Sequence, residues 1–467
     1  MEPKRETSPQ KQSSLIEKFG TKQVQVGVIG LGYVGLPLAL LYARNGFRTT
    51  GFDTDSSKVQ KLQSAQTYIT HIPASLIAAE REHDRFQATA AFERLKEMDA
   101  IIICVPTPLD EHREPDVTYM RNTAETISRY LRPGQLIVLE STTYPGTTEE
   151  LVLPILERSG LRCPIMPYLT DGVSASYSDS SAIDFLVAFS PEREDPGNPS
   201  FQTHQIPKVI GGVNGPSARA AKALYSQVFD RSLLVSSSRA AEMTKLLENI
   251  YRCVNIALVN ELKLLGLRMG IDIWEVIEAA KTKPFGYTPF YPGPGLGGHC
   301  IPIDPFYLTW KAREYDFPTR FIELAGEINS AMPDHVVAAL GEALNQRRQC
   351  LKDAHILVLG VAYKRDIDDL RESPSLRIIE LLRSHGARVD YQDPYFPRLH
   401  KMRHYNFQDM SSVELTAQAL GNYAAVLIAT DHSSYDYPFI VRNAKLVIDT
   451  RNATRDIKEH RDKIVRC

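Results

Sequence analysis

The stretch QVQVGVIGLGYVGLPLALLYARNGFRTTGFDTD, residues 23–55, decides the fold expected for the N-terminal part of this chain. An apolar run from Val24 to Ile29 predicts a buried strand, and a glycine-rich turn follows it. A helix pattern then runs to about Gly46, and a second strand ends at Asp53. A strand, a helix and a second strand in this order form a βαβ unit, in which the two strands are parallel.

The glycines of this stretch predict a dinucleotide site. Gly30, Gly32 and Gly35 form the pattern G-x-G-x-x-G directly after the first strand. The first glycine permits the tight turn, the second lets a pyrophosphate approach the backbone, and the third lets helix and strand pack closely. Asp53 follows at about the 20-residue offset of a ribose-binding acid. No arginine comes directly after Asp53, which favours NAD over NADP. The alternative is that the glycines only shape a turn.

The α/β rhythm continues and then returns near the C-terminus. Residues 100–106 and 135–142 are further buried strands, and residues 236–270 form one long helix pattern. The region 354–393 again reads strand, glycine, helix, glycine, strand and aspartate. We therefore predict an α/β fold with two doubly wound, Rossmann-like parallel-sheet domains joined by a central helical dimerisation region.

Domain boundaries follow from these changes of pattern. The predicted parts are a flexible N-terminal lead-in at 1–22, a dinucleotide-binding domain at 23–235, a central helical domain at 236–340 and a second Rossmann-like domain at 341–467. The serine-rich stretch 169–184 is predicted to be a surface loop.

The bulk properties exclude several classes of protein. The 467 residues carry a net charge of −2 without a long basic block, so nothing indicates nucleic-acid binding. No apolar run reaches the roughly 18 residues of a membrane-spanning helix. The N-terminus lacks the apolar stretch of a signal peptide, and the six cysteines are scattered without a C-x-x-C pair. Together these features predict a cytoplasmic protein with reduced thiols and no bound metal.

One cysteine has an unusual setting. In GLGGHCIPID, residues 295–304, Cys300 follows three glycines and a histidine and precedes two prolines and an aspartate. From these residues alone, Cys300 is either a reactive thiol or a buried small hydrophobic residue.

The chain resembles the UDP-glucose/GDP-mannose dehydrogenase family over nearly its whole length. The motifs that carry the resemblance occur in the family's order and are GLGYVGLPLA, VPTPLD, ESTTYPGTT, FSPERE, EMTKLLENIYRCVNIALVNEL, GPGLGGHCIPIDPFYL and GVAYKRDIDDLRESPS. The form PFGYTPFYPGPGLGGHCIPIDPFYL looks most like the branch that oxidises UDP-N-acetylglucosamine.

The resemblance implies an NAD-dependent enzyme that oxidises the C6 alcohol of a nucleotide sugar to a carboxylate, with two NAD and no metal. Cys300 matches the family's nucleophile, which forms a thiohemiacetal and then a thioester. The implied partners are a UDP-sugar and a second copy of the chain, and the implied pathway is polysaccharide biosynthesis.

The resemblance also assigns roles to individual positions. The catalytic set that it implies is Cys300, Lys245, Asn249, Asp304, Glu192 and Thr142. The cofactor contacts that it implies are Gly30, Gly32, Tyr33, Val34, Gly35, Asp53, Thr107, Thr142 and Arg371. The substrate contacts that it implies are Lys245, Asn249, Tyr287, Tyr291, Gly297, Lys364 and Arg451.

Three interpretations of the function stay open at this point. The favoured one is a four-electron dehydrogenase of UDP-N-acetylglucosamine, with UDP-glucose or UDP-N-acetylmannosamine as alternative substrates. The second is a two-electron hydroxy-acid dehydrogenase, which needs no thiol. The third is a non-catalytic NAD-binding homologue. The number of NADH formed per substrate, which is two, one or none, separates them.

Overall fold

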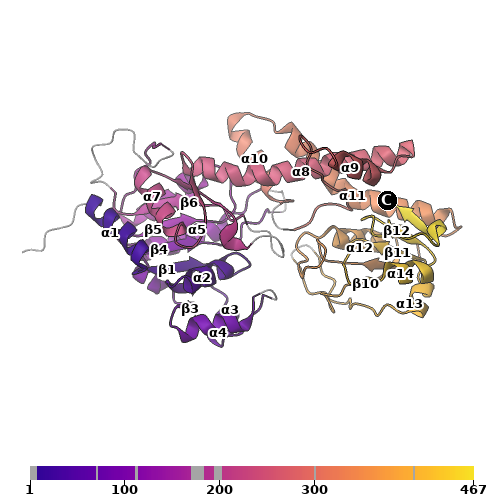
Figure 1. Ribbon diagram of the computed structural model, residues 1–467, viewed down its shortest axis with the longest axis horizontal. Coiled ribbons are helices and arrows are strands. Elements are labelled where there is room, and N and C mark those ends of the chain that lie inside the picture. The colour runs from indigo at the N-terminus through magenta and orange to yellow at the C-terminus, as the bar shows by residue number, and fades with distance from the viewer. Residues whose placement is uncertain are drawn as a thin grey trace, which may run out of the picture. The chain divides into compact units, whose positions relative to one another are not determined.

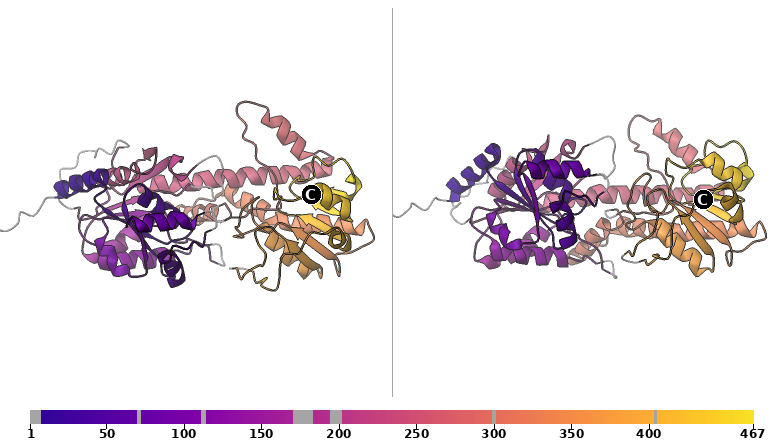
Figure 2. Two further views of the ribbon diagram at one scale, coloured as in Figure 1. Left: turned by 60° about the horizontal axis from the view of Figure 1, so that its bottom comes forward. Right: turned by 90° about the horizontal axis from the view of Figure 1, so that it is seen from below.

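The structure, a computed structural model, describes residues 8–69, 72–110, 114–169, 183–193, 202–298, 301–402 and 405–467. Cys300 and nearly all of the predicted loop 169–184 lie outside the described residues. The chain divides into two compact units, Met1–Glu248 and Asn249–Cys467. The division falls within helix α8 (Ser238–Met269), which Figure 2 shows as one unbroken helix. The three-domain boundaries predicted from the sequence stay a prediction.

Unit 1 is built on an eight-stranded sheet in the order β3-β2-β1-β4-β5-β6-β7-β8. The strands are β1 (Gln25–Ile29), β2 (Arg48–Phe52), β3 (Phe86–Thr89), β4 (Ala100–Ile103), β5 (Leu136–Leu139), β6 (Leu186–Phe189), β7 (Lys208–Gly212) and β8 (Ser232–Leu234). Neighbouring strands are parallel, except that β7 runs antiparallel to β6. The predicted doubly wound sheet is confirmed, with a reversed pair of strands added at one edge.

Helices cover both faces of this sheet (Figure 1). They are α1 (Ser8–Thr21), α2 (Gly35–Arg44), α3 (Ser56–Gln63), α4 (Ala74–Glu82), α5 (Thr118–Tyr130), α6 (Leu153–Leu156) and α7 (Gly215–Tyr225). Successive strand residues alternate between the faces, because side chains of a strand point to opposite sides. Val28 and Ile102 belong to one core cluster, whereas Ile29 and Ile103 belong to the other. Burial on both faces explains why the strands are continuously apolar in sequence.

The N-terminal segment departs from the prediction of a flexible lead-in. Residues 8–21 form α1, and its side chains Leu15 and Phe19 are buried in the same core cluster as Leu224 of α7. The prediction is therefore wrong for these residues. The segment is polar on average, but a short amphipathic helix needs only a few apolar residues to pack on a domain.

Unit 2 contains the rest of α8 and a five-stranded parallel sheet in the order β10-β9-β11-β12-β13. Its strands are β9 (His355–Leu359), β10 (Arg388–Gln392), β11 (Ala425–Ile428), β12 (Val447–Asp449) and β13 (Ile464–Arg466). Its further helices are α9 (Ile273–Lys281), α10 (Asp304–Ala312), α11 (Arg320–Asn345), α12 (Pro374–Ser384), α13 (Ala417–Asn422) and α14 (Tyr437–Asn443). The second Rossmann-like sheet is confirmed.

The two sheets share the same hydrogen-bonded arrangement at the turn after the first strand, in agreement with their similar sequences. Gly30 and Gly360 both follow the first strand with positive φ, at +91° and +81°. Asp53 accepts a hydrogen bond from the N–H of Leu31, and Asp393 accepts one from the N–H of Val361. Each aspartate therefore ties the end of its second strand to the turn after the first strand.

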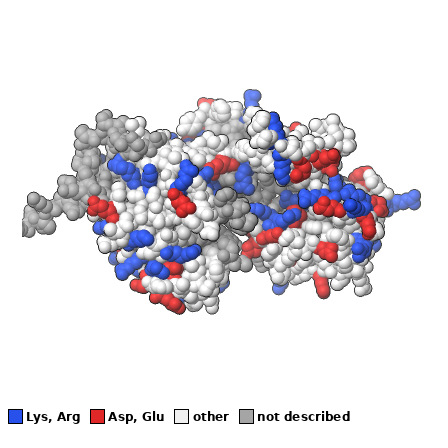
Figure 3. Space-filling view, in the orientation of Figure 1, with Lys and Arg blue, Asp and Glu red and all other residues white. Residues whose placement is uncertain are grey.

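Both acidic and basic side chains appear on the face of each unit shown in Figure 3. None of the helices that the structure describes combines the length and the apolar character needed to cross a membrane.

Candidate active site

The glycine loop of unit 1 has the geometry that a dinucleotide requires. A Cβ atom on Gly30 would lie 2.5 Å from the carbonyl oxygen of Cys104, and one on Gly35 would lie 1.9 Å from the carbonyl oxygen of Gly30. These two positions therefore exclude side chains for packing reasons. A Cβ on Gly32 would meet no atom of the described residues within 4 Å. The space over Gly32 is thus open, as a site for pyrophosphate requires.

The start of α2 continues this site. Val34 is the N-cap residue and supplies no side-chain acceptor, and Tyr33 precedes it in the loop. The first N–H groups of the helix are therefore not capped by a side chain of Val34 and can bind phosphate oxygens. Asp53 is 8% exposed, with Oδ2 2.9 Å from the N of Leu31 and 3.6 Å from Nζ of Lys58. Its carboxylate stands at the end of β2, where a ribose hydroxyl is bound in this fold.

The other predicted residues of unit 1 follow neighbouring strands. Thr107 comes after β4, Thr142 after β5 and Glu192 after β6, and these strands run parallel to β1 in the same sheet. The carboxyl ends of parallel strands meet at one edge, so these residues share that edge with the glycine loop. The hydroxyl of Ser141 donates to the carbonyl oxygen of Val105 at 2.8 Å and joins two of the turns. Thr107 is buried and Thr142 half-buried.

Glu192 belongs to a buried charge cluster that the sequence analysis missed. Lys208 places its Nζ 2.9 Å from Oε2 of Glu192 and 3.1 Å from Oε2 of Glu140. Tyr225 donates its hydroxyl hydrogen bond to the other oxygen of Glu140. Nothing in the local sequence separates Lys208 from an ordinary lysine at the start of a strand, because its partners are far away in the chain.

The surroundings shift the pKa values of Glu140 and Glu192 in opposite directions. Burial raises the pKa of Glu140 to about 7, because the charge of Lys208 only partly offsets the loss of water. Burial would also raise the pKa of Glu192, but the charges and hydrogen bond of Lys208 and the charge of Lys245 hold it below its ordinary value. Glu192 is thus the group of the pair that stays ionised.

Lys245 and Asn249 both lie in α8, one helical turn apart, with exposed fractions of 8% and 4%. In unit 2, Nδ2 of Asn249 donates to Oδ2 of Asp304 at 2.5 Å. Asp304 is fully buried in the first turn of α10, where the helix dipole favours a carboxylate. The structure therefore brings together Asn249 and the aspartate that follows Cys300 in sequence.

The loop before Cys300 is held by buried polar groups of unit 2. The N–H of Gly293 donates to Oδ1 of Asn260 at 2.9 Å, and Nδ2 of Asn260 donates to Oδ1 of Asn329 at 2.9 Å. A Cβ on Gly293 would lie 2.6 Å from a guanidinium nitrogen of Arg451, and one on Gly297 would lie 2.4 Å from Cβ of Tyr363. Close approach therefore explains why glycines stand here.

The candidate substrate and cofactor residues of the C-terminal part lie around this loop. The carbonyl of Arg371 accepts from the N–H of Gly298 at 2.8 Å, while its guanidinium binds the carboxylate of Asp369. Lys364 directly follows Tyr363, which packs on Gly297 and Gly298. Arg371 and Arg451 thus contact the loop that precedes Cys300 in sequence, Lys364 is adjacent in sequence to a residue that does, and their contacts with ligands remain predictions.

Two aromatic residues that precede this loop in sequence, Tyr287 and Tyr291, are predicted to contact the substrate. Tyr291 stacks on Trp274 of α9 with 5.6 Å between ring centroids, and its hydroxyl donates to Glu278 at 2.7 Å. Tyr287 is 37% exposed. The contacts of Tyr291 within the described residues therefore tie this loop to α9, and its predicted contact with a sugar stays a prediction.

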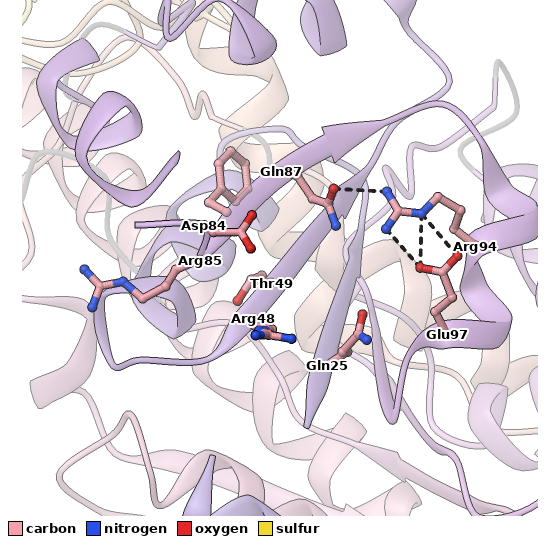
Figure 4. Close-up of a pocket in the computed structure, with 9 residues that line it drawn as sticks. Gln25, Arg48, Thr49, Asp84, Arg85, Gln87, Arg94 and Glu97 are labelled. Carbon is pink, nitrogen blue, oxygen red and sulfur yellow. Dashed lines mark hydrogen bonds and ion pairs between the residues drawn. The ribbon is translucent and has the colours of Figure 1, made fainter. Parts of the chain in front are cut away.

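A cavity of about 200 Å³ in unit 1 lies away from these residues. Gln25, Arg48 and Phe86 line it, and they stand at the amino ends of β1, β2 and β3. Figure 4 shows Arg94 among the lining residues, bound to Gln87 and Glu97. The glycine loop and Asp53 stand at the opposite, carboxyl ends of the same strands, so this cavity is not the dinucleotide site.

Comparison with known proteins agrees with this geometry. Three domain profiles of the UDP-glucose/GDP-mannose dehydrogenase family match the chain, namely the NAD binding domain at 24–229, the central domain at 239–331 and the UDP binding domain at 357–456. The UDP-N-acetyl-D-glucosamine 6-dehydrogenase of Pseudomonas aeruginosa is 33% identical over 417 residues, which cover 89% of this chain and 92% of that protein.

Two further comparisons involve an archaeal relative. The UDP-N-acetyl-D-mannosamine dehydrogenase of Pyrococcus horikoshii is 34% identical over 439 residues, covering 93% of this chain and 96% of that protein. A solved structure of the UDP-D-ManNAc dehydrogenase from this organism matches with a TM-score of 0.79 and 33% identity, covering 93% of this chain and 96% of that one. The chain therefore belongs to the UDP-glucose/GDP-mannose dehydrogenase family and is an NAD-dependent nucleotide-sugar dehydrogenase.

Proposed function

We propose that this enzyme oxidises the C6 alcohol of UDP-N-acetylglucosamine to the carboxylate of UDP-N-acetylglucosaminuronic acid. Bound NAD would supply the hydride acceptor for both oxidations, which corresponds to two NADH per sugar. The open space over Gly32, the start of α2 and Asp53 are the groups that would hold it.

Cys300 is the proposed nucleophile of the second oxidation. A free aldehyde has no alkoxide from which hydride can leave, and addition of the thiolate to the aldehyde carbon supplies one as a thiohemiacetal. Loss of hydride converts this adduct to a thioester. Water then breaks the carbon–sulfur bond, which gives the carboxylate and returns the thiol.

The described residues have matching roles in this scheme. Lys245 stabilises the negative charge that develops on the C6 oxygen, and Glu192 accepts a proton from the alcohol or from the hydrolytic water. Asn249 and Asp304 hold the attacking water, with Thr142 as a further water-binding group.

One observation carries the proposal most directly. Asn249, one helical turn after the candidate lysine, is bonded to Asp304, which follows Cys300 by four positions in the sequence. A two-electron dehydrogenase needs no thiol nucleophile, whereas here a cysteine in a glycine-rich stretch precedes Asp304 in the sequence. A non-catalytic homologue would be expected to have lost part of the catalytic set, whereas Cys300, Lys245, Asn249 and Asp304 are all present in the sequence.

The substrate assignment has a specific competitor. The Pseudomonas aeruginosa relative supports UDP-N-acetylglucosamine, and the Pyrococcus horikoshii relative, at 34% identity, supports UDP-N-acetylmannosamine. We choose the gluco epimer because the stretch 284–308 most resembles that branch of the family. UDP-glucose remains the further alternative.

The deciding experiment measures kcat/KM for UDP-N-acetylglucosamine, UDP-N-acetylmannosamine, UDP-N-acetylgalactosamine, UDP-glucose and GDP-mannose side by side, with NADH counted per sugar consumed. Two NADH per sugar and a preference for UDP-N-acetylglucosamine support the proposal, and a preference for another sugar refutes the substrate. Cys300→Ala should abolish formation of the acid while NAD binding is kept. If this variant still forms uronic acid at a near-normal rate, the thioester route is wrong.

The proposed assembly is a homodimer through α8. Apolar side chains on the part of α8 in unit 2 recur at helical spacing and are 39–61% exposed: Tyr251, Leu258, Leu262, Leu265 and Met269. Other apolar residues of the same helix, such as Val259, are buried. A helix with one buried and one exposed apolar face is typical of an element that packs against a second copy.

A further inference from the structure

Lys208 is a buried cation that no step proposed above uses. Its side chain is 2% exposed, and its ammonium contacts carboxylate oxygens of Glu192 and Glu140. The ring centroids of Tyr225 and Phe229 lie 5.3 Å and 5.1 Å from Nζ. The ammonium group is thus surrounded by two carboxylates and two aromatic rings, which restrict its position.

The reversed strand explains how Lys208 reaches this position. Lys208 is the first residue of β7, and β7 runs antiparallel to β6. The amino end of β7 consequently lies beside the carboxyl end of β6, which Glu192 follows. The hydroxyl of Ser190 donates to the carbonyl oxygen of Val209 at 2.8 Å and holds the two strand ends together. In an all-parallel sheet, a lysine at this point of the strand would stand at the opposite edge.

We propose that Lys208 is a positioning residue that holds the carboxylate of Glu192 ionised and fixed in orientation for proton abstraction. The proposal rests on the base role proposed above for Glu192. An ammonium group 2.9 Å from Oε2 favours the charged form of the carboxyl and restricts its rotation.

Glu140 gives Lys208 a second counter-charge. A buried ammonium needs compensation, and a single carboxylate would supply it. When two carboxylates share one ammonium, their mutual repulsion makes it easier for one of them to take up a proton. Burial raises the pKa of Glu140 to about 7, while Glu192 remains ionised. Pairs of carboxyl groups whose surroundings separate their pKa values in this way commonly divide acid and base roles.

Other charged and titratable groups also face this cluster. Lys245 of α8 acts on Glu192 as a second cation. The groups that face Glu140 or Lys208 from the remaining elements are Tyr225 of α7, Tyr42 of α2 and Cys104 after β4. Burial raises the pKa of all three well above its ordinary value, so they stay neutral near pH 7. Lys208 is thus a cation in direct contact with Glu192, and these three groups add no charge beside it.

The test compares Lys208→Met with Lys208→Arg in the full-length enzyme. Removal of the cation should lower kcat by about 10- to 100-fold, which is a part of the roughly 10²- to 10⁴-fold that a general base contributes. The acid limb of the kcat profile should move up by about 1 to 3 pH units, because an opposite charge in contact lowers a carboxyl pKa by about that much. Lys208→Arg keeps the charge and should restore the position of the limb. Lys222→Met, which removes an exposed lysine of α7, is the matched control and should change neither.

A double-mutant cycle separates positioning from mere packing. If Lys208 acts through Glu192, adding Lys208→Met to Glu192→Gln should lower kcat no further than Glu192→Gln alone. An additive loss, or an unmoved acid limb in Lys208→Met, would overturn the proposal. Should Lys208→Met not fold, the pair Lys208→Met with Glu140→Gln removes the cation and one carboxylate together and carries the same pH test. A normal kcat in Glu192→Gln would instead refute the base role of Glu192 itself.

Discussion

The glycine loop allows a prediction about alanine substitutions at two of its glycines, one of which should weaken NAD binding and the other lower the stability of the fold. Gly32→Ala places its methyl group in open space, since no atom in the part of the chain that the structure describes lies within 4 Å of the position that a Cβ atom would take. The fold should tolerate it, with the free energy of unfolding changed by no more than about 1 kcal/mol. The methyl would stand where the pyrophosphate approaches the backbone. We expect NAD affinity to fall at least about tenfold, or about 1.4 kcal/mol.

Gly35→Ala should show the reverse pattern. Its Cβ would lie 1.9 Å from the carbonyl oxygen of Gly30, whereas ordinary contacts begin at 3.4 Å. The first turn of α2 and the loop must therefore separate by more than an ångström. Overpacking of this kind costs about 1–3 kcal/mol, so the melting temperature should fall by several degrees.

The assay pairs calorimetric titration with NAD and thermal unfolding without it, for both variants and for Gly20→Ala. Gly20 lies in α1, and its Cβ would meet no described atom within 4 Å. This control should leave the NAD affinity unchanged and should not lower the melting temperature, because alanine is at least as favourable as glycine in a helix. Wild-type NAD affinity in Gly32→Ala would refute the placement of the pyrophosphate. An unchanged melting temperature in Gly35→Ala would refute the packing argument.

Three further predictions concern other parts of the molecule. Asp304→Ala leaves the amide of buried Asn249 without its partner, so urea unfolding should show a loss of about 1–3 kcal/mol together with a loss of turnover. Leu258→Glu with Leu262→Glu should convert the proposed dimer to a monomer in light scattering, and a monomeric wild-type protein would contradict the proposed assembly. Burial raises the pKa of Glu242 to about 7, so the folded state holds a proton that the unfolded state loses near its ordinary pKa of about 4.3. The contribution of Glu242 to stability should therefore decline between about pH 4.3 and 7, and Glu242→Gln should flatten the measured curve in that window.

Much of the fold could be predicted because local patterns carry it. The strands that end near Gly30 and Asp53 are visible as continuous apolar runs, since a strand covered on both faces has no polar alternation. The helix predicted at 236–270 is observed at 238–269, and Gly270 follows it with φ of +72°. Helix α1 could not be predicted in this way, because a few buried apolar residues in a polar segment give a weak pattern.

The residues of the candidate site also separate into those that sequence motifs predict and those that only the structure brings together. The roles of Lys245, Asn249 and Asp304 are assigned from family motifs, and the structure adds the hydrogen bond between Asn249 and Asp304. Lys208 and Glu140 could not be predicted, because their partners are distant in sequence and neither residue stands in a recognisable motif. Cys300, which the sequence places at the centre of the mechanism, lies outside the described residues.

The sequence by itself determined the two βαβ starts, the glycine pattern, the acid at the end of each second strand and the long helix. These features depend on residues close together in the chain, whose spacing is visible without a structure. Only the tertiary structure decided the direction of β7, and with it the edge at which Lys208 stands. Strand direction depends on the route of the connecting chain and on pairing with distant strands, and apolar composition is the same for either direction. The charge on Glu192 is therefore set by an arrangement that no local pattern encodes.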